Sequence, residues 1–164
     1  MALSKEKKGQ VIERLKKIWK SPSVVFVQFH TLTVARAQAL RRALRAFGSG
    51  YFVAKKTLIR KSLEGTPIEG DAPVLEGEIG VSYMESGEDL TAPAREVFGF
   101  GNKAEHAVRL VGGIFEGRFI GMQEALSLAA IPPRQTLLAQ FVNLVNSPIQ
   151  RLVVGLDQIA KKRI

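Results

Sequence analysis

Residues 23–63 read SVVFVQFHTLTVARAQALRRALRAFGSGYFVAKKTLIRKSL and alternate between two kinds of pattern. The run 23–29 is short, β-branched and aromatic, which is typical of a buried strand, and 51–54 indicates a second strand. A helix is predicted over 33–47, capped by the threonine at its start and stopped by Gly-Ser-Gly. Another helix is predicted over 55–63. This order of strand, helix, strand and helix predicts an α/β fold.

The alternation continues on both sides of this stretch, as far as residue 131. Apolar residues at helical spacing predict a helix that is capped at Ser4 and extends to Lys20. Glu116-Gly117 fits a two-residue hairpin turn. Further strands are predicted over 79–83, 108–115 and 118–120, and further helices over 90–98 and 122–130. The expected architecture is a compact α/β sandwich formed by residues 1–131.

Residues 132–134, Pro-Pro-Arg, indicate a hinge, because proline cannot continue a helix and restricts the residue before it. Residues 135–164 then predict an extended amphipathic helix. Ser147-Pro148 either starts a second helix or kinks a continuous one, and we interpret the segment as two units, 135–146 and 148–163. The helix carries one apolar stripe, which we predict to bind a partner: Leu138, Phe141, Val142, Val145, Ile149, Leu152, Leu156 and Ile159.

The sequence is compatible with two roles for this stripe: packing on the protein's own domain, or binding a partner protein. Amphipathic helices more commonly pack on their own domain than on a partner. The Pro-Pro boundary and the length of the stripe favour a protein interface instead. Pro148 argues against an uninterrupted homodimeric coiled coil.

Positive charge is concentrated at the N-terminus. The net charge is +9, but residues 1–62 carry 15 Lys and Arg against two Glu, whereas residues 63–131 have a net charge of −8. This distribution favours a polyanionic partner, although a merely solvated basic face stays open. Lysines at a predicted helix start, where the backbone amides attract phosphate, strengthen the case. The candidate RNA contacts are Lys5, Lys7, Lys8, Thr31, Thr33, Arg41, Lys55, Lys56, Thr57 and Arg60.

The basic region has only a few aromatic residues, and Phe26 and Phe29 among them are expected to be buried. With so few aromatic rings to offer, we expect recognition of folded RNA by its shape and backbone rather than by stacking on single-stranded bases.

The sequence contains little that would indicate a metal site, a cofactor site or a catalytic site. There is no cysteine, there are only two histidines, and neither histidine has metal-ligand spacing, so no metal and no cofactor are expected. Gly99 to Ala104 matches a loose dinucleotide-binding pattern, but it follows a predicted helix and is interpreted as a helix end and loop. We expect no enzymatic activity. The alternatives are a small phosphate-handling enzyme and a peripheral membrane protein that uses its amphipathic tail.

The order of several motifs resembles one family, the large-subunit ribosomal stalk-base proteins, or bacterial ribosomal protein L-ten family. The resemblance covers essentially the whole chain. It lies in Leu32-Thr33-Val34, Leu40-Arg41 to Arg45, Tyr51-Phe52-Val53-Ala54-Lys55-Lys56-Thr57-Leu58, Leu63-Glu64-Gly65-Thr66-Pro67, Gly112-Gly113 to Glu116-Gly117-Arg118, and Leu128-Ala129-Ala130-Ile131-Pro132-Pro133-Arg134. The chain departs from the family pattern at His30-Thr31, at Lys56 and at Gly77-Glu78.

The resemblance implies a cytoplasmic protein of the ribosome. Its N-terminal domain is expected to bind the large-subunit rRNA of the GTPase-associated centre, beside ribosomal protein L-eleven. Its C-terminal helix is expected to carry dimers of the acidic stalk protein, which recruit translation factors. The break at Pro148 suggests two docking sites and hence two dimers. No membrane partner is implied.

Overall fold

A computed structural model describes residues 5–64, 66, 68–70, 72–86, 89–103 and 108–162. The chain divides into two compact units, 1–131 and 132–164. The second unit consists of one helix, α6 (Arg134–Lys162). The first unit contains, in order, α1 (Lys5–Ile18), β1 (Ser23–Phe29), α2 (Val34–Ala46), β2 (Ser49–Val53), α3 (Lys56–Leu63), β3 (Glu78–Met84), α4 (Ala92–Lys103), β4 (Val108–Phe115), β5 (Arg118–Ile120) and α5 (Met122–Ala130).

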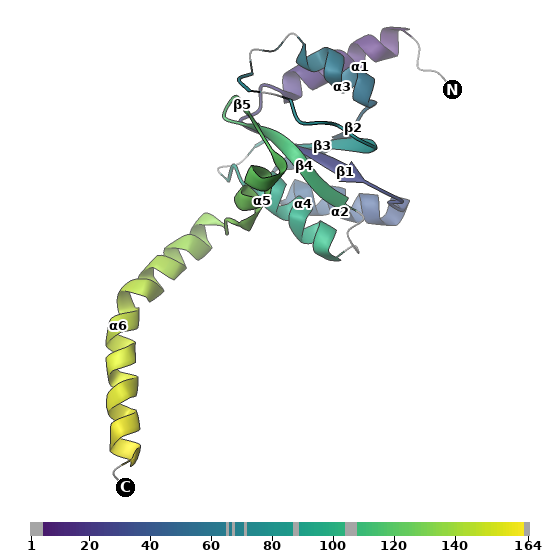
Figure 1. Ribbon diagram of the computed structural model, residues 1–164. Helices are drawn as coiled ribbons and strands as arrows, with labels where there is room; N and C mark the ends of the chain where they lie inside the picture. The colour runs from purple at the N-terminus through teal and green to yellow at the C-terminus, as the bar shows by residue number, and fades with distance from the viewer. Residues whose placement is uncertain are drawn as a thin grey trace. The chain divides into compact units, whose positions relative to one another are not determined.

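The five strands form one antiparallel sheet in the order β2-β3-β1-β4-β5. Helices α1 and α3 cover one face of this sheet, and α2, α4 and α5 cover the other (Figure 1). The central strand β1 serves both layers, because alternate side chains of a strand point to opposite faces. Val24 and Phe26 join the core under α1 and α3, whereas Val25 and Val27 join the core under α2 and α4. The predicted α/β sandwich is confirmed.

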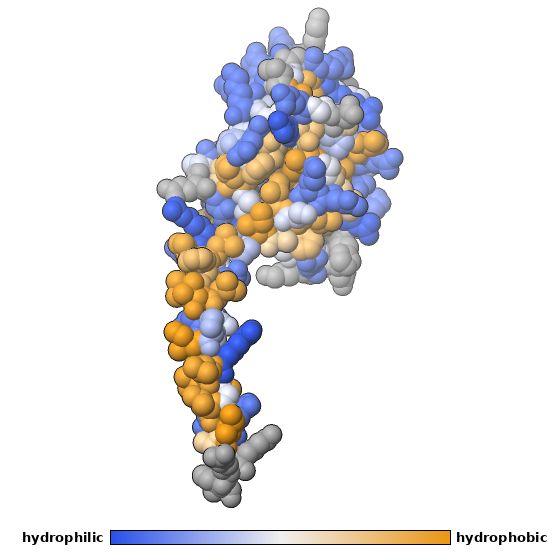
Figure 2. All heavy atoms as spheres, turned by 60° about the vertical axis from the view of Figure 1, so that its left-hand side comes forward, coloured by the Kyte–Doolittle hydropathy of each residue, from blue (hydrophilic) through white to orange (hydrophobic). Residues whose placement is uncertain are grey.

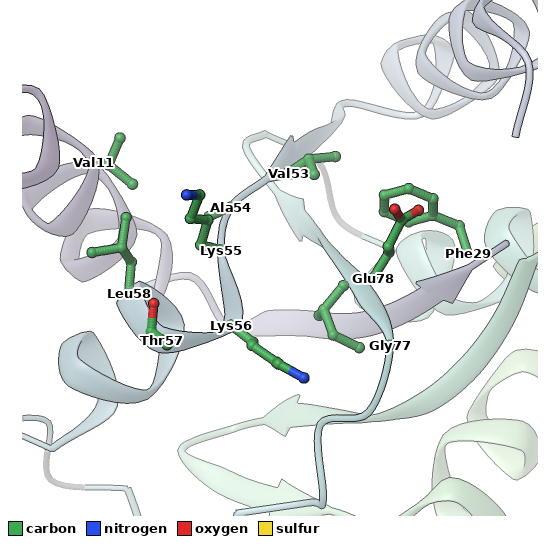
Figure 3. A pocket seen from close by; sticks show the side chains of 11 residues that line it. Val11, Phe29, Val53, Ala54, Lys55, Lys56, Thr57, Leu58, Gly77 and Glu78 are labelled. Carbon is green, nitrogen blue, oxygen red and sulfur yellow. The ribbon is translucent and has the colours of Figure 1, made fainter. Parts of the chain in front are cut away.

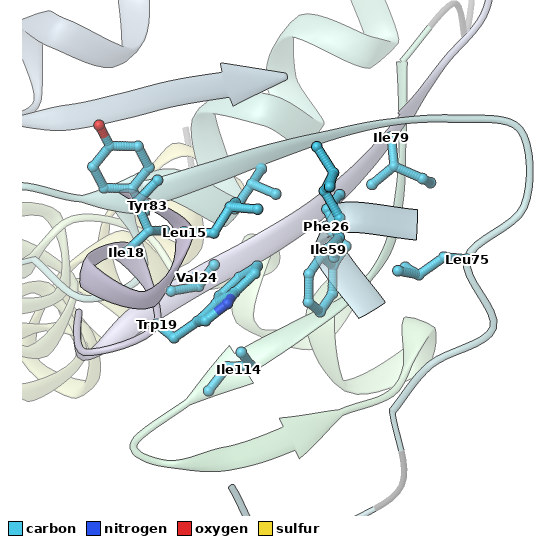
Figure 4. Packing of buried hydrophobic residues seen from close by; sticks show 12 residues of the cluster. Leu15, Ile18, Trp19, Val24, Phe26, Ile59, Leu75, Ile79, Tyr83 and Ile114 are labelled. Atoms are coloured by element: carbon cyan, nitrogen blue, oxygen red, sulfur yellow. The ribbon is translucent and has the colours of Figure 1, made fainter. Parts of the chain in front are cut away.

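The first core is centred on Trp19 and Phe26, whose ring centroids are 5.7 Å apart (Figure 4). The indole Nε1–H of Trp19 donates to the Ser62 hydroxyl at 3.0 Å, and that hydroxyl donates to the Ile59 carbonyl at 2.7 Å. The first bond joins the end of α1 to α3, and the second holds the Ser62 hydroxyl within α3. The helices that carry most of the predicted RNA contacts are therefore linked to each other.

The predicted cap of α2 is confirmed, since the Thr33 side chain accepts a hydrogen bond from the Arg36 amide at 3.4 Å. The Gly-Ser-Gly segment after α2 was interpreted as a helix stop, but only its first residue serves that role. Gly48 alone makes the turn, with φ at +66°. Ser49 and the following glycine already pair with β3, so β2 begins two residues earlier than predicted. The predicted cap of α1 at Ser4 lies outside the described residues.

Helix α4 corrects one sequence interpretation. Gly99 and Gly101 were expected to end the helix near residue 98, yet α4 runs through both of them to Lys103. The physical reason is close packing, because a Cβ at Gly101 would lie 2.5 Å from the Val108 carbonyl oxygen on β4. This glycine lets the helix approach the strand. The interpretation of Gly99 to Ala104 as a helix end and loop is therefore wrong, and Ala104 itself lies outside the described residues.

Helix α6 is continuous, so the interpretation of two separate helices over 135–146 and 148–163 is wrong, and the kinked alternative holds. It begins at Arg134, which the sequence assigned to the hinge. Pro148 lies inside it and cannot donate a hydrogen bond to the Leu144 carbonyl, and such a loss bends a helix. Figure 1 shows the bend. Among the described helices, none is long and apolar enough to cross a membrane.

Tyr51 on β2 carries a buried hydroxyl that has no hydrogen-bond partner among the described residues. Burial raises its pKa to about 12, against a smaller opposing effect of the Arg41 charge. We expect Tyr51→Phe to raise the free energy of unfolding by about 1 kcal/mol, because an unpaired buried hydroxyl is removed. Between pH 10 and 12 the wild type also loses stability that the variant keeps, since the unfolded tyrosine ionises first.

Urea unfolding at pH 7 and pH 11 measures both effects. Tyr83→Phe is the matched control, because the Tyr83 hydroxyl donates to the Glu85 carboxylate at 3.1 Å. Its removal is expected to leave stability unchanged or lower it at pH 7. A loss of stability in Tyr51→Phe would show that its hydroxyl has a partner.

Candidate nucleic-acid interface

The start of α3 presents two lysines, and its first turn contains no acid. Lys55 is the N-cap residue in an extended conformation, and the first turn of the helix contains no carboxylate. The amides of Leu58 and Ile59 are the first to bond within the helix, both to the Lys55 carbonyl, at 2.9 and 3.1 Å. The amides of Lys56 and Thr57 precede them and have no carbonyl four residues back in the helix. The positive end of the helix and two exposed ammonium groups therefore coincide.

Lys55, Lys56 and Thr57 line a pocket of about 580 Å³ (Figure 3). The pocket lies at the end of the sheet where β2 stops at Val53 and β3 starts at Glu78. Its other walls come from α1, from the last residue of β1, from residues at or next to the ends of β2 and β3, and from α3 itself: Val11, Phe29, Val53, Ala54, Gly77, Glu78, Ile79 and Leu58. Antiparallel pairing places Phe29 directly opposite Glu78, so segments distant in sequence meet around the start of α3.

Helix α1 brings two more predicted residues beside this pocket. Lys7 and Lys8 lie four and three residues before Val11, which lines the pocket, and residues at this spacing share one side of a helix. Both side chains are exposed. Lys5 begins α1, but its side chain lies outside the described part of the chain.

Thr31 and Thr33 follow β1 in the loop at the same end of the sheet. Thr31 adopts a left-handed conformation, with φ at +48°. Both side chains are exposed. The Thr33 oxygen already accepts a bond from the backbone of α2, so its hydroxyl proton is the group that can still be offered to a phosphate oxygen.

Arg41 and Arg60 are not brought to the pocket. Arg60 lines a different cavity of about 500 Å³, next to Leu63 and Phe119. Arg41 lies on the other face of the sheet, and its guanidinium is 5.8 Å from the centre of the Tyr51 ring. Apart from Lys5, the predicted contacts therefore divide into a group around the start of α3, two threonines after β1 at the same end of the sheet, and two outlying positions.

Arg14 is a residue that the sequence did not single out. Its guanidinium lies 4.8 Å from the centre of the Phe52 ring, close enough for a cation–π interaction. Phe52 and Tyr51 are consecutive in the edge strand β2 and point to opposite faces. Arg14 and Arg41 consequently flank this edge from both sides, each stacked on a ring that limits its freedom.

The apolar stripe of α6 is exposed along its length (Figure 2). Among all the exposed large apolar side chains of α6, the exposed fraction runs from 41% at Leu137 to 73% at Leu144. These side chains include all eight predicted partner contacts, and also Val153 and Val154. Residues 135–150 contain no charged side chain. Within residues 134–162, the described helix of this unit, no second element covers the stripe.

Comparisons with known proteins agree with this arrangement. The family model described as "Ribosomal protein L10" matches residues 3–101, a range that contains every residue lining the pocket. The chain is also similar to a protein of Leptothrix cholodnii named "Large ribosomal subunit protein uL10". The two are 33% identical over 164 residues, which cover 99% of this chain and 88% of the relative. This second match extends through α6.

Proposed function

Because this chain belongs to the ribosomal protein L10 family and is a structural constituent of the large subunit of the cytoplasmic ribosome, we propose two binding functions for it. The N-terminal unit binds large-subunit rRNA of the GTPase-associated centre, beside ribosomal protein L-eleven. Helix α6 anchors dimers of the acidic stalk protein that recruits translation factors. Neither function requires catalysis, and we assign no enzymatic activity.

The observation that carries RNA binding is the cluster of cations around the start of α3. Lys55 and Lys56 are exposed on a helix start without a neighbouring acid in its first turn, and Lys7 and Lys8 lie beside them on α1. Lysines at the positive end of a helix, such as Lys55 and Lys56, are unfavourable in isolation, whereas a phosphate satisfies both the amides and the lysines. The exposed threonines after β1 add hydroxyl donors for the backbone of the same RNA.

Replacing Lys56 tests this site. We expect Lys56→Ala to weaken binding to a large-subunit rRNA fragment about tenfold at 0.1 M KCl. The slope of log affinity against log salt should fall in magnitude by about one, because one phosphate contact is lost. Filter binding at four salt concentrations measures both quantities.

Lys61→Ala is the matched control, since it removes the same charge from the same helix but lies outside the pocket. Equal losses in the two variants would mean that RNA responds only to the general positive charge of this unit, and the specific site would be wrong.

The observation that supports partner docking is the uncovered stripe of α6 combined with its lack of charge over 135–150. An exposed apolar surface of this length is characteristic of a protein interface, and helix-in-groove binding uses anchors at this spacing. The bend at Pro148 divides the stripe into two straight segments. We assign one acidic dimer to each segment.

A further inference from the structure

We propose that the pocket at the start of α3 holds a single unstacked base of the bound RNA, with the phosphate of that nucleotide at Lys55 and Lys56. This inference rests on the proposed binding of rRNA and goes beyond it, because it assigns base recognition to a surface expected to read only shape and backbone.

The lining of the pocket is the first reason. A phosphate needs donors and positive charge, which Lys55, Lys56 and the first amides of α3 supply. It gains nothing from an apolar cavity, where its desolvation is costly. Yet the cavity beside these lysines is mainly apolar: Val11, Phe29, Val53, Ala54, Leu58 and Ile79. A ligand that fits both parts joins an anion to a flat, poorly hydrated group, and a nucleotide has this chemistry.

The shape of the pocket is the second reason. Figure 3 shows Val11 and Leu58 on one side and Phe29 and Glu78 on the other, with the lysines of the α3 start between them. Its volume of about 580 Å³ lies in the range of roughly 300–1,000 Å³ typical of small-molecule sites. Phe29 was expected to be buried, but it is only half-buried: it packs partly against the core under α2 and α4 and also contributes to the lining of the cavity. An aromatic wall next to cations is the arrangement on which unstacked bases bind.

Glu78 is the third reason. It is an exposed carboxylate in the lining of an otherwise cationic site, and it lies opposite Phe29 across the β1–β3 pair. An acid so close to a phosphate site weakens attraction to RNA unless it makes a contact of its own. Carboxylates accept hydrogen bonds from the amino groups of bases, as in contacts to N4 of cytosine. The site is therefore expected to take a base with an exocyclic amino group and to discriminate against uracil.

Two variants of the full chain test this pocket with the same rRNA fragment. Val53→Trp fills the cavity from an edge-strand position where an aromatic side chain is well tolerated. Glu78→Ala removes the carboxylate and with it the acceptor for the base, whereas general electrostatics alone would strengthen RNA binding when an acid is lost. If a base occupies the pocket, both variants should weaken binding on the order of 10- to 100-fold. The salt slope should stay unchanged, because no phosphate contact is lost.

The matched control for the acid is Glu76→Ala, which changes an exposed glutamate outside the pocket lining. It is expected to leave RNA affinity unchanged or slightly stronger. Far-UV circular dichroism and thermal unfolding verify that each variant is folded. Folded variants that bind as tightly as the wild type, with the salt slope retained, would overturn the base pocket and leave rRNA binding intact. If the wild type itself binds no rRNA, the proposed function fails, and the base pocket fails with it.

Discussion

Native mass spectrometry of the full chain with Leu152→Asp is expected to show one acidic dimer bound, whereas the unaltered chain is expected to bind two. Leu152 is 65% exposed and lies on the stripe after Pro148. In the proposed complex its side chain is expected to be buried, and an aspartate there would leave an unpaired charge in an apolar interface. Such a charge costs several kcal/mol, so the affinity of that segment falls by a factor of 100 or more.

Val142→Asp is expected to remove the other dimer, because Val142 lies on the same stripe before Pro148. The double variant should bind none. Gln140→Asp and Gln150→Asp are the matched controls, since they add the same charge to the uncharged polar side of the same helix. These controls should keep both dimers. Washing at high salt removes bound RNA but spares the partner, because an apolar interface is weakly screened.

Two outcomes would contradict this assignment. If Leu152→Asp releases every dimer, the two segments of α6 act as one site and the bend at Pro148 does not divide them. If the Gln→Asp controls release the partner equally, the apolar stripe does not form the interface.

Most of the fold could be predicted from local patterns. Strand β1, helix α2 with its threonine cap, and the hairpin between β4 and β5 depend on residues that are neighbours in sequence, and all three were confirmed. The predictions that were wrong, the end of α4 and the division of α6, depend on more than the local sequence pattern. Gly101 looks like a helix end in sequence but allows α4 to approach β4. Pro148 bends α6 without dividing it, because the remaining hydrogen bonds of the helix persist on both sides.

The candidate site was only partly predictable, for a related reason. The lysines at the start of α3 could be recognised, since helix starts carry a local signal. Phe29, Glu78 and Val11 could not be joined to them, because this requires knowing that β3 inserts between β1 and β2 in antiparallel register. Arg14 was one basic residue among many until its stacking on Phe52 was visible. Non-local strand pairing built the pocket, and no short motif encodes that pairing.

The second large effect is expected for Trp19→Ala, which should lower the free energy of unfolding by about 3–5 kcal/mol. Trp19 is 4% exposed, packs on Phe26 and donates its indole N–H to Ser62. The substitution leaves a large cavity between α1 and β1 and removes the bond between α1 and α3. Urea unfolding followed by far-UV circular dichroism measures the loss, because Trp19 is the only tryptophan and its fluorescence disappears in the variant.

Trp19→Phe and Ser62→Ala separate packing from the hydrogen bond. Trp19→Phe keeps most of the apolar contact and loses the donor, whereas Ser62→Ala leaves the buried indole N–H without its acceptor and should cost about 1–3 kcal/mol. The double variant should cost less than the sum of the two, because both single changes break the same bond. A Trp19→Ala variant that loses under 1 kcal/mol would mean that α1 is not packed on the sheet as described. A second measurement tests the link to function: the RNA affinity of each variant is compared under conditions where the variant is still folded. If α1 and α3 must be held together for their lysines to contact one RNA, that affinity falls more in Trp19→Ala than in Trp19→Phe.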